Sequence, residues 1–221
     1  MRSILVMLKT VVLLLIPAIA LALTAQNRGN YSSFDTSEDL LLVQYDSLPD
    51  PDDVHCHAAL GCMLLNPDLK NVDTYAVLGT TGTQELEQGF IDTTPLMNIN
   101  HSPQGKDTWT NAWDGHLARG ANWNRSVRRI KNKVKSIIQN GGVVFVAEAG
   151  QSSINADRIE ALINEDVSSS LIKSNVVVVQ HSVWNEAAKP YEIEADRSLW
   201  IRVGLGLATP QYPVGSIFLI W

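Results

Sequence analysis

The stretch LLLVQYDSLPDPDD, residues 40–53, decides the fold of this chain. Residues 40–45 form a short apolar run with polar residues on either side, which indicates a buried strand. The two prolines that follow indicate a loop. Residues 55–65 then indicate a helix that Asn66-Pro67 ends. Its expected apolar face consists of Ala58, Ala59, Cys62, Met63 and Leu65.

The same alternation continues along the chain. Further strands are expected at 72–78, 143–147 and 176–179, and further helices at 125–139 and 156–163, with an irregular stretch at 84–123. Alternating strands and helices predict an α/β fold with a mostly parallel sheet, helices on both faces and a Rossmann-like core.

Ligands of such sheets bind beyond the carboxyl ends of the strands. Four loops follow the expected strands, and parallel strands bring their loops to one rim. We therefore expect the site among the loops 46–53, 79–83, 148–153 and 180–186.

The amino terminus predicts a secretory signal peptide over residues 1–25. Arg2 and Lys9 precede an apolar run that small residues follow, the order that signal peptidase reads. The alternative is a transmembrane anchor, which needs about 20 apolar residues; this run is shorter and contains Pro17. We expect a secreted or periplasmic protein with no stable membrane anchor after cleavage.

The rest of the chain predicts one domain. Residues 26–38 are polar and are expected to form a flexible lead-in, and residues 39–221 a single α/β domain. The chain ends in the apolar run SIFLIW, which suggests a domain that is incomplete at its carboxyl end.

Charge and cysteine content narrow the partners. Loss of residues 1–25 removes two bases and lowers the formal charge from −6 to −8. Binding to phosphate backbones needs a basic protein surface, so we expect no nucleic-acid partner. A homo-oligomer stays open.

The two cysteines are expected to be unpaired. Cys56 and Cys62 on one helix would lie about 9 Å apart, too far for a disulfide, and two buried thiols are expected.

The acidic loop is the first candidate site. Asp46, Asp50, Asp52 and Asp53 lie within eight residues, and carboxylates this close repel unless a cation or hydrogen-bond donors compensate. Oxygen ligands suit calcium or magnesium, and a carboxylate beside such an ion could deprotonate a water. The alternative is a solvated turn with an aspartate at the helix start.

A second candidate group follows the most β-branched strand. His181 could act as a general acid, with Trp184 and Asn185 beside it; the alternative is a structural histidine.

Three tryptophans of the irregular stretch and two histidines of the first expected helix are further candidates. The indoles of Trp109, Trp113 and Trp123 could stack on a sugar or base, or form a small core. The one-residue spacing of His55 and His57 points them to different sides of a helix, which disfavours zinc.

Two segments resemble a known family. VQYDSLPDPDDVHCHAALGCMLLNPDLKNVDTYAVLGTTG, residues 43–82, is similar to the opening of the nucleoside hydrolase superfamily, and its Asp-Pro-Asp-Asp ending to a divergent, secreted branch. VVFVAEAGQSSINADRIEAL, residues 143–162, resembles a later strand, turn and helix of that family. The resemblance implies a nucleoside hydrolase-like fold.

The resemblance also implies roles for particular residues. Asp53 would bind Ca²⁺ through both oxygens, Asp52 would contact a sugar hydroxyl, and a backbone carbonyl near Ser153 would complete part of the calcium shell. Leu48 stands where typical members have a metal-binding, water-activating aspartate, and Asp50 is its expected substitute. The expected ligands of Ca²⁺ are therefore Asp46, Asp50, Asp53 and Ser153.

Two functions stay open. The first is a secreted calcium-dependent hydrolase of N-glycosidic bonds in nucleosides or related glycosides, with Asp50, Asp52 and His181 as catalytic residues. Its ligand would be bound by Asp52, Trp184 and Asn185. The second is a non-catalytic, secreted sugar-binding module on a degenerate fold of the same kind, which Leu48 favours.

Overall fold

The computed structural model describes residues 34–47, 52–80, 90–101, 107–115, 120–148, 153–180 and 216–218. The chain divides into two compact units, Met1–Phe34 and Asp35–Trp221, and every described helix and strand belongs to the second. The expected signal peptide and most of the expected lead-in lie outside the described residues. Within the described part, no helix is both long enough and apolar enough to span a membrane.

One parallel sheet forms the centre of the second unit. Its strands are β1 (Leu40–Tyr45), β2 (Asp73–Leu78), β3 (Trp109–Asn111), β4 (Val144–Glu148), β5 (Val176–Gln180) and β6 (Ser216–Phe218). They are hydrogen-bonded in the order β3-β2-β1-β4-β5-β6, and every neighbouring pair is parallel. This is the strand order of a Rossmann-like sheet, so the predicted parallel α/β sheet is confirmed.

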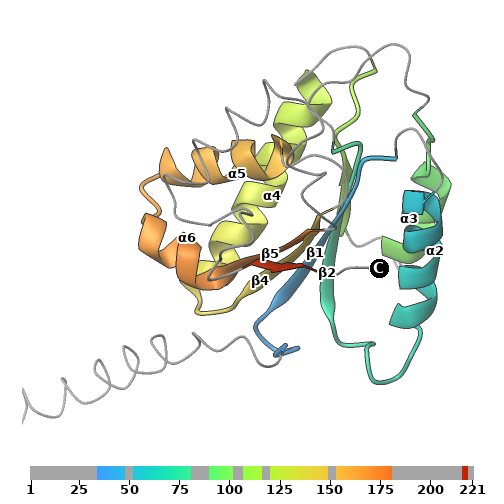
Figure 1. Cartoon of the computed structure of the whole chain (residues 1–221), viewed down its shortest axis with the longest axis horizontal. Coiled ribbons are helices and arrows are strands. Elements are labelled where there is room, and N and C mark those ends of the chain that lie inside the picture. Colours follow the sequence, from blue (N-terminus) through green and yellow to red (C-terminus); the bar gives the residue numbers. More distant parts are fainter. Residues whose placement is uncertain are drawn as a thin grey trace, which may run out of the picture. The chain divides into compact units, whose positions relative to one another are not determined.

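Helices cover both faces of the sheet (Figure 1). The helices are α2 (Asp52–Leu64), α3 (Thr94–His101), α4 (Ala121–Gln139), α5 (Ser153–Ile163) and α6 (Ser169–Asn175). One face packs against α4, α5 and α6 around a large apolar core, and the other face packs against α2 and α3 around a smaller one. Because both faces are covered, the central strands β1, β4 and β5 are mostly apolar, with polar residues only near their carboxyl ends.

The long helix α4 starts earlier than its apolar pattern predicts. The expected stripe is confirmed, since Val127, Ile130, Val134 and Ile138 are all buried. The helix nevertheless begins at Ala121, because the two carboxylate oxygens of Asp114 accept hydrogen bonds from the backbone N–H groups of Asn122 and Trp123, each at 2.8 Å. The side chain of Asp114, seven positions before the first residue of the helix, thus satisfies N–H groups that the first turn leaves open.

The stretch 84–123, expected to be irregular, contains α3 and β3. A side-chain turn introduces α3, since Asp92 Oδ1 accepts a hydrogen bond from the N–H of Thr94 at 2.9 Å. The chain then adds β3 to the edge of the sheet beside β2. Both elements are short, and their stability comes from packing rather than from a local apolar pattern.

The predicted apolar face of α2 is wrong. Met63 and Leu65 are 56% and 83% exposed, Ala58, Ala59 and Cys62 are also exposed, and both cysteines are free and exposed rather than buried. The buried residues of α2 are Asp53 and His57. The helix contacts the sheet through Asp53 and His57 near the carboxyl end of β1 and through Leu60, which packs against the smaller core.

Candidate functional site at the switch point of the sheet

The strand order places a topological switch point between β1 and β4. The chain leaves β1 toward α2 on one face and leaves β4 toward α5 on the other. At such a switch point the two connections diverge, and ligands of open α/β sheets bind in the gap. The loops that follow β1 and β4 are therefore the natural place for a site.

The turn after β1 brings two carboxylates together. Asp46 and Asp53 are 7% and 5% exposed, and the backbone N–H of Ser47 donates to Asp53 Oδ2 at 2.8 Å. Ser47 adopts a φ of 58°, a conformation that costs a non-glycine residue about 1 kcal/mol or more. Its hydroxyl is buried and has no hydrogen-bond partner among the described residues. Strain and an orphaned oxygen at one position suggest a functional turn.

Asp52 lies differently from Asp53. It is the first residue of α2 and is exposed, and its Oδ1 accepts a hydrogen bond from the backbone N–H of Asp53 at 2.8 Å. A carboxylate at this position also interacts favourably with the helix dipole. Asp52 therefore stabilises the start of the helix.

The carboxylates make this region electronegative. Burial, and after it the charges of Asp53 and Cys56, raise the pKa of the Tyr45 phenol far above its ordinary value. Burial, followed by the charges of Asp53 and Asp52, also raises the pKa of the Cys56 thiol. Both groups stay neutral at pH 7, and the local potential favours a bound cation.

The end of β4 carries a buried polar network that the sequence did not predict. The amides of Gln44 and Asn155 bond to each other in both directions, at 2.8 and 3.0 Å, and Asn155 Nδ2 also donates to Glu148 Oε1. Gln44 is 1% exposed, Asn155 is fully buried and Glu148 is 5% exposed. The network joins β1, β4 and α5 at the switch point.

Arg158 of α5 lies deeper in the same region. It is fully buried, and none of its guanidinium nitrogens has a hydrogen-bond partner among the described residues. Burial lowers its pKa to about 10, and the charge of Glu148 partly opposes this effect. An arginine on the apolar stripe of a helix, four residues from both Ile154 and Leu162, is costly unless a negative charge compensates.

The expected site residues fall into two groups. Asp46, Asp53 and Ser153 are buried at the rim formed by β1 and β4, where Ser153 begins α5. Asp50, His181, Trp184 and Asn185 lie outside the described residues, so their roles stay predictions. Sequence reasoning missed Ser47, Glu148, Asn155 and Arg158. Of these four, only Glu148 was predictable from the sequence, because it is a carboxylate that directly follows the apolar run of its strand.

The donor chemistry fits a hard cation. Asp46, Asp53 and the Ser47 hydroxyl offer oxygen atoms in one turn, and oxygen is the ligand that calcium prefers. No group of three or more His, Cys, Asp or Glu residues is placed to hold a metal ion within the described ranges, which do not include Asp50.

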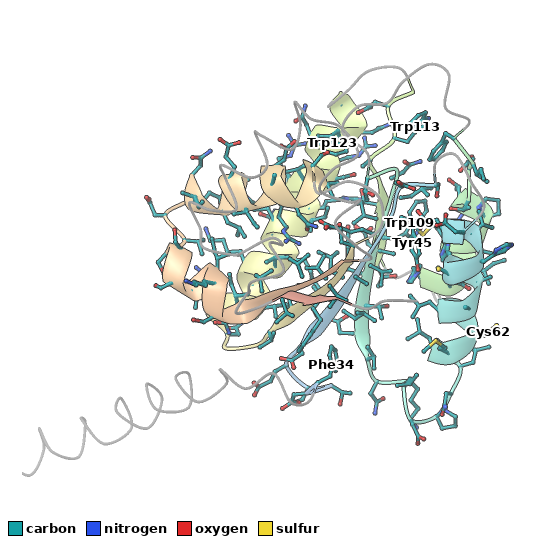
Figure 2. The ribbon with its side chains drawn as sticks, viewed as in Figure 1. Phe34, Tyr45, Cys62, Trp109, Trp113 and Trp123 are labelled. Carbon is teal, nitrogen blue, oxygen red and sulfur yellow. The ribbon has the colours of Figure 1, made fainter. Side chains whose placement is uncertain are left out.

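The three tryptophans have separate environments (Figure 2). Trp123 belongs to the large core, and its Nε1 donates to Asp157 Oδ2 at 2.7 Å, so its interpretation as a ligand contact is wrong. Trp109 lies on β3 beside the smaller core. Trp113 stacks on Phe90, with ring centroids 4.3 Å apart and planes 7° apart. Both rings are half-buried.

A second aromatic cluster lies under α2. Tyr45, His57 and His101 are stacked, with ring centroids 4.7 Å apart in the first pair and 5.2 Å in the second. All three are buried, and their polar ring atoms have no hydrogen-bond partner in the described part of the chain. His55 is exposed, so it points away from His57 as predicted. The lone pairs of parallel stacked imidazoles do not converge on one ion.

No protein-family model, curated protein or solved structure matches this chain.

Proposed function

We propose that this chain is an exported, calcium-dependent hydrolase of N-glycosidic bonds in nucleosides or related glycosides, on a nucleoside hydrolase-like fold. The observation that carries the proposal is a pair of buried carboxylates at the switch point, Asp46 directly after β1 and Asp53 in the first turn of α2. The resemblance of residues 43–82 to that superfamily supports the same reaction.

Hydrolysis of such a bond needs charge stabilisation and two proton transfers. Positive charge develops on the sugar ring as the C–N bond breaks, and the carboxylates of the turn stabilise it. Asp50 takes a proton from the water whose oxygen bonds to the anomeric carbon, and His181 donates a proton to the departing nitrogen. Asp52, Trp184 and Asn185 hold the sugar and the leaving group.

Ca²⁺, when bound, would orient the sugar hydroxyls and polarise the water. The residues that would hold it are Asp46, Asp50 and Asp53, with a backbone carbonyl near Ser153. Ser47 keeps Asp53 in place through its N–H donor at 2.8 Å. Since Leu48 can neither bind a cation nor accept a proton, Asp50 must supply the base.

The test is an assay of the purified protein on inosine, uridine and p-nitrophenyl riboside, with Ca²⁺ and with a chelator. Asp53→Asn keeps an oxygen for the Ser47 N–H and removes the charge, and we expect a loss of about 100-fold or more in kcat/KM. Asp68→Asn, an exposed substitution in the turn after α2, is the matched control. Calcium at a hundredfold excess over its dissociation constant should stabilise the fold by about 2.7 kcal/mol.

A sugar-binding module is the second candidate, and the half-buried Phe90–Trp113 stack favours it, since flat aromatic surfaces pack against sugar rings. Binding of ribosides in a calorimeter without turnover, abolished by Trp113→Ala, would replace the hydrolase with the module. A melting temperature that a chelator leaves unchanged would remove calcium from either function.

A further inference from the structure

Glu148 occupies a position at the switch point that no expected catalytic residue fills. The register of β1 and β4 pairs Val43 with Ala147, so Glu148 lies beside Gln44, two residues before Asp46. Side chains alternate along a strand, and Gln44 and Glu148 both reach Asn155 on the α5 side. The carboxylate therefore lies next to the turn that carries the candidate ligand-binding aspartates.

Its orientation is determined by neighbouring side chains. Glu148 Oε1 accepts a hydrogen bond from Asn155 Nδ2, and the reciprocal amide pair with Gln44 holds Asn155 itself. A carboxylate held in this way is aimed rather than free, which is what a group that contacts a ligand requires.

Arg158 of α5 is a charged neighbour of Glu148, since the two charges interact. The strand register pairs Glu148 with the neutral Gln180 of β5, and the neutral Gln44 of β1 is hydrogen-bonded to the same Asn155. Arg158 is fully buried, and its guanidinium has no hydrogen-bond partner in the described part of the chain.

We propose that Glu148 contacts the sugar at the switch point and that Arg158, which is fully buried, is a positioning residue whose charge attracts the Glu148 carboxylate. The inference rests on the proposed function and adds a residue to its site. A purely structural pair would close into a direct ion pair, which satisfies both groups. Within the described part of the chain the guanidinium makes no hydrogen bond, and Asn155 donates to Glu148.

The first test is a set of matched variants assayed on p-nitrophenyl riboside. Glu148→Gln keeps the Asn155 hydrogen bond and removes the charge, and kcat/KM should fall about 100-fold. The control Glu160→Gln, at an exposed position of α5, should leave kcat/KM unchanged. Arg158→Met should lower kcat/KM by a similar factor, and Arg158→Lys should lower it less than about tenfold. The control Arg128→Met, at an exposed position, should leave kcat/KM unchanged. Equal activity of Glu148→Gln and the wild type would overturn the proposal.

Two further measurements separate positioning from simple loss of stability. The double variant Glu148→Gln/Arg158→Met should be no less active than Glu148→Gln alone, because Arg158 acts through Glu148. Carboxyl ¹³C NMR should show Glu148 titrating at a higher pH in Arg158→Met than in the wild type, because the variant lacks the neighbouring positive charge. This titration needs no turnover. If the wild type hydrolyses no riboside, the proposed function fails, and an unmoved Glu148 titration then overturns the inference on its own.

Discussion

Acidification should destabilise this protein through the stacked histidines under α2. Burial, and next the neighbouring His101, lower the pKa of His57 from 6.5 to about 4, and burial lowers the pKa of His101 by the same amount. Both imidazoles are 1% exposed and are neutral in the folded protein at pH 7. The rings stacked on His57 are Tyr45 of β1 and His101 of α3.

The sign follows from proton binding. Between pH 6.5 and pH 4 the unfolded chain binds protons at these histidines and the folded chain does not, so the free energy of unfolding falls as the pH falls. Above pH 6.5 the pair has no effect. With a pKa of about 4 in the folded protein and 6.5 in the unfolded chain, each histidine lowers the free energy of unfolding by about 2 kcal/mol between pH 7 and pH 5. Solvent screening near α2 and α3 reduces this effect. We therefore expect the two histidines together to lower the free energy of unfolding by about 2–3 kcal/mol.

The assay is urea unfolding at pH 7, 6 and 5 for the wild type and for His57→Phe/His101→Phe. Phenylalanine keeps the stacked shape and cannot bind a proton, so the double variant should lose about 2–3 kcal/mol less than the wild type on going to pH 5. At pH 7 it should be at least as stable, since it removes buried nitrogens that lack partners in the described part of the chain. His55→Gln, exposed on the same helix, is the control. Parallel pH profiles for the wild type and the double variant would refute the reasoning.

Three further outcomes are expected. Asp114→Ala removes the carboxylate that accepts two N–H groups at the start of α4 and should lower the free energy of unfolding by about 1–2 kcal/mol in urea; an unchanged midpoint would contradict this. Gly79→Ala should destabilise by at least about 1 kcal/mol, because φ is +75° and a Cβ there would lie 2.8 Å from Trp113 Cβ; a normal melting temperature would count against it. Ellman's reagent should label both exposed cysteines of the folded protein. Cys56 should react more slowly, because its raised pKa leaves less thiolate, and labelling only in denaturant would show that the two thiols are buried.

Comparison of the predicted and observed elements shows how far local patterns reach. The apolar runs at 40–45, 143–147 and 176–179 predicted three strands of the sheet, because a strand covered on both faces is mostly apolar. The stripe of α4 predicted which side of that helix is buried. The short elements α3, β3 and α6 were missed, since few residues carry too little periodicity to read.

The aspartates after β1 and their place at the carboxyl rim followed from the order of residues along the chain. The tertiary structure alone shows which distant segments meet at this rim of the sheet. Strand order puts β4 beside β1, and Asn155 thereby reaches Gln44 across 111 positions of sequence. The same packing buries Arg158 near Glu148 and turns His57, rather than Met63 or Leu65, toward the sheet. Periodicity reports the environment of a single segment, whereas these contacts depend on how two segments pack, and no local pattern contains that information.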